Sequence, residues 1–224
     1  METFATQAAA EPWGAPAAQV ALLAIAISCG ALILLHVISP EFSPSWRMVS
    51  EYADGRYSGL LTLVFLTWAI SSFALVVALW PLSSSGLGKA GLLLLAVAGV
   101  GQLMGGMFDI NHPLHGPAAM IGIPALCAGA VVLTIALSRH PGIDAPPLWT
   151  AHQPWISFVL VIAALLLFFS ALKAAGIDMS GRSAPLAELP PGVSGYVGWA
   201  NRLLFLASYL WATLAALSVL RTQA

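Results

Sequence analysis

The stretch AQVALLAIAISCGALILLHVI, residues 18–38, contains no Asp, Glu, Lys or Arg. A helix needs roughly 20 apolar residues to cross the hydrocarbon core of a bilayer, which is about 30 Å thick. The stretch does not alternate apolar and polar residues with a period of two, as the strands of a membrane barrel do. Because lipid cannot hydrogen-bond an open backbone, the run predicts a membrane-spanning helix.

Five further apolar runs of similar length follow and are separated by Pro- and Gly-containing connections. They predict an all-α polytopic membrane protein, folded as a six-transmembrane-helix bundle. A single membrane domain is expected over residues 18–221, preceded by a flexible N-terminal tail over residues 1–17. Within the third run, Gly101 and Gly105 form a small-xxx-small pair, which we interpret as close packing between neighbouring helices. The predicted spans are 18–38, 59–80, 89–108, 116–138, 155–174 and 200–220.

The composition supports a membrane protein and excludes other classes. Of the 224 residues, 59% are hydrophobic and only 8% are charged, whereas soluble domains carry about a quarter charged residues. The formal net charge of −1 provides no basic surface for nucleic acid. The two cysteines, Cys29 and Cys127, lie inside apolar runs, so no disulfide framework is expected. The tail lacks the basic start of a cleavable signal peptide.

The orientation in the membrane depends on which cations count as topology markers. Six spans place both termini on one side, here called the terminal side. Taken literally, the distribution of Lys and Arg places the opposite side in the cytoplasm. Three of the opposite-side arginines are candidate functional residues, however, and without them the counts are three and two. We favour cytoplasmic termini. The cations are Lys89, Arg139 and Arg221 on the terminal side, and Arg47, Arg56, Lys173, Arg182 and Arg202 on the opposite side.

Three titratable residues, Asp109, His112 and His115, lie within seven positions of the turn between the third and fourth spans. His115 is expected in the first turn of the fourth span, where the positive helix N-terminus favours a neutral imidazole. With Asp109, the two histidines offer an N,N,O donor set suited to zinc or iron. A fourth ligand would come from His36, Glu41 or Glu51 if the first span packs beside the fourth. Alternatively, these residues cap helices and bond to the first connection.

Arg202 lies two or three residues inside the sixth apolar run, with no other cation beside it. Buried arginines are rarely left unpaired, and Asp109 or Glu51 would be natural partners. One interpretation is an Arg–carboxylate clamp that fixes the sixth span to the rest. The other is an anion site for a lipid phosphate or a substrate carboxylate, because guanidinium matches the geometry of both.

The first connection carries the segment SEYADGRYSG, residues 50–59. Ser50 is expected to cap the N-terminus of a short interfacial helix. An alternative role is nucleophile, with His115 or His112 as the base that such a serine needs. Tyr52 and Arg56 in this segment, and Asn201 beside Arg202, are further candidate ligand-binding residues.

At these positions the chain resembles the bacterial and archaeal membrane-protein family called domain of unknown function 998 (DUF998). Four segments carry the resemblance: HVISPEFSP (36–44), VSEYADGRYSG (49–59), GMFDINHPLH (106–115) and NRLLFLASYLW (201–211). The resemblance covers roughly residues 18–221 and implies six helices in a bacterial inner (plasma) membrane, without an activity. It places Ser50, Glu51, Tyr52, Asp109, His115 and Arg202 on the family's polar motif positions. The gap between Asp109 and His112 is shorter than the family pattern.

Two kinds of function stay open. The first is a membrane-embedded hydrolase or lipid-modifying enzyme, with Asp109, His115, Ser50 and Glu51 as catalytic residues and zinc or iron as a possible metal. Arg202, Tyr52, Asn201 and Arg56 would then bind a small anionic or amphipathic ligand. The second is a non-catalytic lipid- or anion-binding, transport or accessory protein whose polar cluster clamps helices. Unbroken spans and the absence of an internal repeat argue against transport. Membrane lipid is the expected partner, and the oligomeric state stays open.

Overall fold

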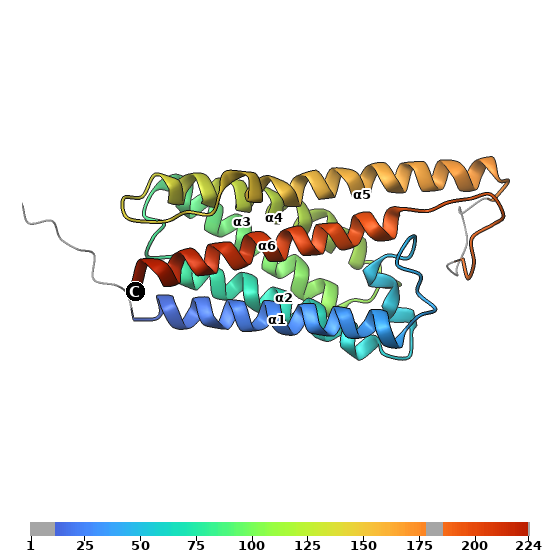
Figure 1. Cartoon of the computed structure of the whole chain (residues 1–224), viewed down its shortest axis with the longest axis horizontal. Helices are drawn as coiled ribbons and strands as arrows, with labels where there is room; N and C mark the ends of the chain where they lie inside the picture. The colour runs from blue at the N-terminus through green and yellow to red at the C-terminus, as the bar shows by residue number, and fades with distance from the viewer. Residues whose placement is uncertain (1–11, 178–185, 224) are drawn as a thin grey trace, which may run out of the picture.

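The structure is a computed structural model that describes residues 12–177 and 186–223, and every regular element in these residues is a helix (Figure 1). Six of the helices are long and apolar enough to cross a membrane, which confirms the predicted six-helix bundle. A short 3-10 helix lies in the first connection. The elements are α1 (Gly14–Ile38), η1 (Val49–Asp54), α2 (Ser58–Leu79), α3 (Gly86–Met107), α4 (His115–Ser138), α5 (Leu148–Ala174) and α6 (Val197–Gln223).

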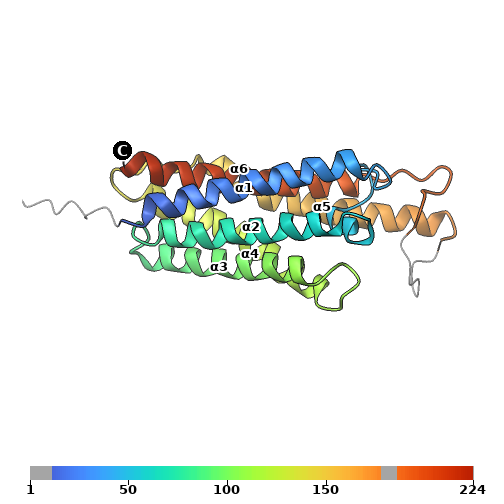
Figure 2. The same ribbon diagram turned by 90° about the horizontal axis from the view of Figure 1, so that it is seen from below.

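The six long helices form a closed ring in chain order. Each packs against the next, and α6 returns to pack against α1. Contacts between α2 and α6 cross the middle of the ring. This contact leaves α1 on one side, and α3, α4 and α5 on the other, as Figure 2 shows for α3 and α4. The start of α1 and the end of α6 lie at the same end of the bundle (Figure 1).

All six long helices begin earlier than the sequence predicted, and α1 and α5 show the largest differences, four and seven residues. α1 begins at Gly14, inside the tail predicted over residues 1–17, of which residues 1–11 lie outside the described part of the chain. α5 begins at Leu148 instead of residue 155, with Pro147 in the N-cap position. Pro154 lies in the second turn of α5 and removes only one intrahelical hydrogen bond there. The proline therefore does not mark the start of the helix.

The helices differ in how much of their surface the bundle covers. In the apolar stretch of each helix that would cross the membrane, only 17% of the residues of α5 are buried, compared with 61% of those of α6. In both views α5 runs past its neighbours at the end of the bundle that holds η1 (Figures 1 and 2). α5 is therefore the helix that faces lipid most, and α6 is the central one.

Small residues allow α3 and α4 to pack closely against each other. A Cβ atom added at Gly101 of α3 would lie 2.6 Å from the Cα of Gly122 in α4. Such close approach between backbones is what small residues permit in membrane helices. The position of Gly101 thus supports the interpretation of Gly101 and Gly105 as residues that allow close packing between helices. A Cβ at Gly105 would meet the ring of Phe65 instead.

Candidate functional site

Arg202 lies in the second turn of α6 and is only 5% exposed. Its Nε donates to His36 Nε2 (2.5 Å), and one terminal nitrogen donates to the carbonyl oxygens of Arg47 (2.6 Å) and Gly198 (3.1 Å). The other terminal nitrogen donates to the Tyr52 hydroxyl (3.3 Å). All three nitrogens of the guanidinium are thus engaged, and they join α6, α1, η1 and the loop before η1. We call these contacts the Arg202 clamp.

The acceptors in the Arg202 clamp are neutral groups, not the carboxylates that the sequence predicted. Asp109 is exposed on the turn between α3 and α4, and Glu51 makes its ion pair with a different arginine, Arg47. His36 can accept from Arg202 because its Nδ1 is bonded to the Leu32 carbonyl oxygen (2.6 Å). A carbonyl only accepts, so the neutral ring carries its hydrogen on Nδ1 and leaves Nε2 as the acceptor.

Arg47 forms the second buried cation of this region and is 6% exposed. Its Nε lies 3.1 Å from Glu51 Oε1, but the N–H is not directed at an acceptor, so the contact is an ion pair and not a hydrogen bond. Another nitrogen donates to the Leu186 carbonyl oxygen (2.5 Å). The guanidinium also lies over the rings of Phe42 and Trp46, about 5 Å from each centroid. Arg47 therefore ties the first connection to the segment before α6.

Glu51 is held by this arginine and by the backbone. Its Oε2 accepts from the Met48 N–H (2.5 Å), which caps the start of η1. Burial raises the pKa of the Glu51 carboxyl, although the Arg47 guanidinium and the Met48 N–H each act to lower it. The carboxylate is thus committed to structure and is not among the residues that line a cavity. This pair was not predicted from the sequence, although the i, i+4 spacing of Arg47 and Glu51 was an available signal.

Ser50 lies inside η1, one residue after its start, so the expectation that Ser50 caps this helix was wrong. The capping acceptor is the Glu51 carboxylate, because it is close enough to reach back to the Met48 N–H. Asn201 of α6 fixes the same end of η1, since its Oδ1 accepts from the Val49 N–H (2.9 Å). The Ser50 hydroxyl makes no hydrogen bond to another residue in the described part of the chain.

The titratable side chains of the turn between α3 and α4 do not form a cluster. Asp109 accepts from the Asn111 N–H (2.9 Å), and the Asn111 side chain donates to Asp54 (2.8 Å). His112 is exposed, and its ring stacks on Phe108. Over residues 12–177 and 186–223, no group of three or more His, Cys, Asp or Glu residues is arranged to hold a metal ion. The zinc or iron site expected at Asp109, His112 and His115 therefore has no support from the geometry.

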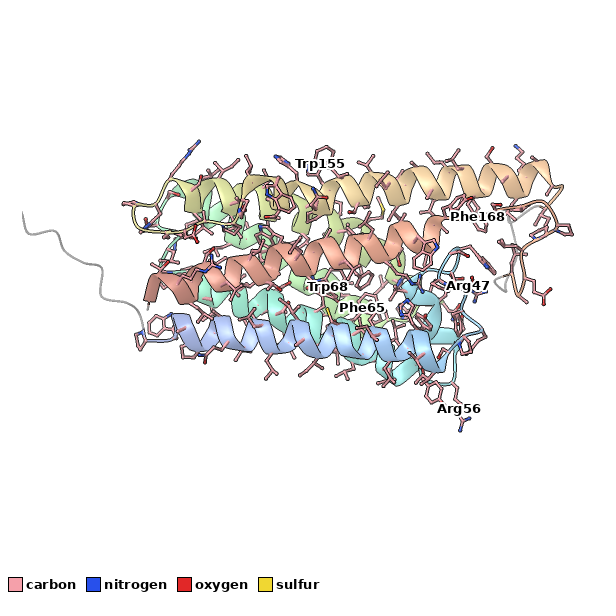
Figure 3. The ribbon with its side chains drawn as sticks, viewed as in Figure 1. Arg47, Arg56, Phe65, Trp68, Trp155 and Phe168 are labelled. Atoms are coloured by element: carbon pink, nitrogen blue, oxygen red, sulfur yellow. The ribbon has the colours of Figure 1, made fainter. Side chains whose placement is uncertain are left out.

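The possible fourth ligands of that metal lie elsewhere as well. α1 packs against α2 and α6, so His36 at the end of α1 reaches Arg202 of α6. Glu41 is exposed, and Glu51 pairs with Arg47. Arg56 is also outside the cluster: it is exposed, lies over the Tyr57 ring and points away from the bundle (Figure 3). Tyr52 is buried within the Arg202 clamp.

His115 is the first residue of α4, where the sequence predicted it, and is half-buried. Its Nδ1 bonds to the Phe108 carbonyl oxygen (2.8 Å), so the neutral ring carries its hydrogen on Nδ1. The ring meets Phe65 of α2 edge to face, with centroids 6.4 Å apart. Nε2 is then the nitrogen of His115 that can accept a hydrogen bond from another molecule.

His115 lines a cavity of about 310 Å³ that lies between α2, α3, α4, α5 and α6. This cavity lies on the α3–α5 side of the contact between α2 and α6. Its lining includes the aromatic rings of Phe65 and Trp68, whose position inside the bundle is seen in Figure 3. Met120 and Ile162 also line it and are 65% and 41% exposed. The cavity therefore reaches the outer surface of the bundle between α4 and α5.

The polar groups of the cavity are few and are mostly at one end. Ser50, His115 and Asn201 line the end nearest η1. Leu126 of α4 lines the inner end, and Leu126 follows His115 by 11 positions, which is roughly 16 Å along the helix. Gln102, 6% exposed, is the polar residue of the inner part and bonds to Ser72. In the orientation of its amide that satisfies all partners, it also bonds to Trp68.

The cavity was not predicted from the sequence. Most of its lining residues are apolar, and in a membrane protein an apolar residue carries no signal that separates a cavity from a lipid-facing surface. Gln102 was the one available signal, because an amide inside an apolar run needs a partner. Of the predicted site residues, the structure brings Ser50, His115 and Asn201 to the cavity. It places Arg202 and Tyr52 in the clamp, and Asp109 and Arg56 on the surface.

Among known proteins, the chain matches one family model over residues 13–218, nearly its whole length. The family is described as "Protein of unknown function (DUF998)", which confirms the resemblance found in the polar motifs. No curated protein and no solved structure matches the chain.

Proposed function

The chain belongs to the DUF998 family, and we propose that it binds a membrane amphiphile, with the apolar chain in the cavity and the polar head at Ser50, His115 and Asn201. The observation that carries this proposal is the distribution of polarity along the cavity. An apolar lining runs from the end nearest η1 to Leu126, a depth of roughly half the thickness of a hydrocarbon core.

The size and the opening of the cavity support the same ligand. Ligand pockets are typically about 300–1,000 Å³ and mostly apolar, with a few polar groups that fix orientation. The volume of about 310 Å³ lies at the lower end of that range. The exposed lining residues Met120 and Ile162 provide an entry from the side. A molecule that is already dissolved in the bilayer would enter there without crossing water.

A pair of matched substitutions in α4 tests this proposal. Ala119 lines the cavity and is half-buried, so Ala119→Phe would place a ring inside it. Ala128 is exposed on the same helix and is not a lining residue, so Ala128→Phe adds the same ring to the lipid-facing surface. We expect an amphiphile to co-purify with the parent and with Ala128→Phe, and to be depleted in Ala119→Phe. Mass spectrometry of the purified proteins measures this. Equal amounts in all three would contradict the proposal.

We propose a catalytic use of the same cavity as a second candidate. Ser50 and His115 line it together, so a serine nucleophile and an imidazole base would face one ligand. Asp109 and Glu51 are given no catalytic role here, because one is exposed on the turn and the other is paired with Arg47. A fluorophosphonate probe that labels the parent, but not Ser50→Ala or His115→Phe, is the expected result. Labelling of none of the proteins would remove this candidate and leave binding intact.

We also propose that the protein resides in a bacterial plasma membrane with cytoplasmic termini. Of the cations at the other end, Arg47 and Arg202 are buried against protein groups and are poor topology markers. Without these two, the Lys and Arg counts are three on each side, so the charge distribution no longer places the other end in the cytoplasm. The polar end of the cavity would then face outward. A C-terminal alkaline phosphatase fusion should be inactive, and the corresponding green fluorescent protein fusion should fluoresce.

A further inference from the structure

We infer that the head of the bound amphiphile is neutral and carries a hydroxyl group, and is not a phosphate, sulfate or carboxylate. This inference rests on the proposed function, because it concerns the ligand of the same cavity. It starts from the charge of the lining. None of the described residues that line the cavity is Asp, Glu, Lys or Arg.

The two buried arginines near this end of the cavity do not offer a positive charge to a ligand. Arg202 donates from all three nitrogens to His36, Tyr52 and backbone carbonyls. Arg47 pairs with Glu51 and donates to the Leu186 carbonyl. Neither arginine lines the cavity. An anionic head would therefore lose its water without gaining an Arg or Lys partner, which is a large cost in an apolar environment.

The groups that do line this end suit a hydroxyl. His115 presents Nε2 as an acceptor, because its Nδ1 is held by the Phe108 carbonyl. The Ser50 hydroxyl can both donate and accept. The Oδ1 of Asn201 is engaged by the Val49 N–H, so its amide NH₂ is the part that can donate to a ligand. A hydroxyl donates one hydrogen bond and accepts two, so its bonding capacity matches one acceptor and two donors of this kind.

Quenching of tryptophan fluorescence distinguishes between ligands with different head groups. Trp68 lines the cavity, and a bromine atom on a ligand chain quenches a nearby indole. Three probes with the same chain are titrated into the detergent-solubilised protein: 11-bromoundecanol, 11-bromoundecyl sulfate and 1-bromoundecane. The sulfate keeps its charge at every pH used. A Trp68→Phe variant isolates the signal of Trp68 from that of the other tryptophans.

We expect the alcohol to quench Trp68 at the lowest concentration. Ser50→Ala should weaken quenching by the alcohol roughly threefold to tenfold, the value of one hydrogen bond, and leave quenching by bromoundecane unchanged. If the sulfate or bromoundecane quenches Trp68 at the same concentration as the alcohol, the inference is overturned while binding in the cavity stands. If no probe quenches Trp68, the proposed function itself fails.

Discussion

The Nε of Arg202 in α6 donates to the Nε2 of His36 in α1, across 2.5 Å and 166 residues of sequence. This contact closes the ring of helices at the end that carries η1. The same guanidinium holds the carbonyl of Arg47 and the hydroxyl of Tyr52, so one side chain orders the first connection as well. Gly198 lets the loop approach this closely, since a Cβ there would collide with the carbonyl oxygens of Pro44 and Arg47.

The clamp predicts a large loss of stability for Arg202→Lys. A lysine keeps the charge but cannot reach His36, Tyr52 and two carbonyls at once, because its donors radiate from a single nitrogen. Several buried acceptors would lose their partner, at a cost of about 3 kcal/mol in the free energy of unfolding. Thermal melting in detergent measures the effect, with Arg56→Lys on the exposed surface as the control. An unchanged melting temperature for Arg202→Lys would refute the clamp.

Stability should depend on pH through Glu51. Because burial raises the pKa of this carboxyl in the folded protein, the folded state holds the proton to a higher pH than the unfolded state, whose pKa is about 4.3. The contribution of Glu51 to stability is therefore greatest below that value and falls as pH rises through the folded pKa.

The Glu51→Gln variant makes this dependence measurable. The amide cannot lose a proton, so the melting temperature of the parent should fall relative to that of Glu51→Gln as pH is raised from about 4. Glu41→Gln, at an exposed residue, is the matched control. A parent that gains stability over Glu51→Gln with rising pH would show that the ion pair with Arg47 outweighs burial.

The contact between α3 and α4 predicts unequal effects of two glycine substitutions. Gly101→Ala would force the helices apart, because the new Cβ would stand 2.6 Å from the Cα of Gly122. We expect a cost of about 1–3 kcal/mol. A Cβ added at Gly30 in α1 would have no other atom within 4 Å, so Gly30→Ala should be neutral or slightly stabilising. Unfolding of both variants in a denaturing detergent tests the difference, and equal stabilities would argue against tight α3–α4 packing.

A hydrogen-bond chain in the core predicts that Ser28→Ala costs more than Tyr209→Phe. The Ser28 hydroxyl donates to the Val64 carbonyl (2.8 Å) and lies 2.6 Å from the Tyr209 hydroxyl. Since Ser28 uses its hydrogen on Val64, the Tyr209 hydroxyl donates to Ser28. Ser28→Ala leaves that hydroxyl buried without an acceptor, at about 2 kcal/mol, whereas Tyr209→Phe leaves no donor unpaired and should cost about 1 kcal/mol or less. The reverse order of melting temperatures would contradict this hydrogen-bond direction.

The polar residues of the candidate site were visible in the sequence, but their pairing was not. An isolated Arg202 in an apolar run predicts a buried partner, and the expected partners were the carboxylates of Asp109 and Glu51. The structure pairs it with His36 and Tyr52 instead. The reason is the ring order: α6 lies between α5 and α1, and Asp109 stays on the exposed turn after α3.

The sequence by itself determined the six helices, their approximate limits and the concentration of polar groups at one end, because lipid requires long apolar runs with internally bonded backbones. The tertiary structure decided which polar groups meet. Arg202 reaches partners 150 or more positions away in the Arg202 clamp, and the cavity exists only because α3, α4 and α5 enclose the space beside α2 and α6. Hydrophobicity directs a helix into the membrane without specifying its neighbours, and those neighbours are selected by packing and hydrogen bonding between helices.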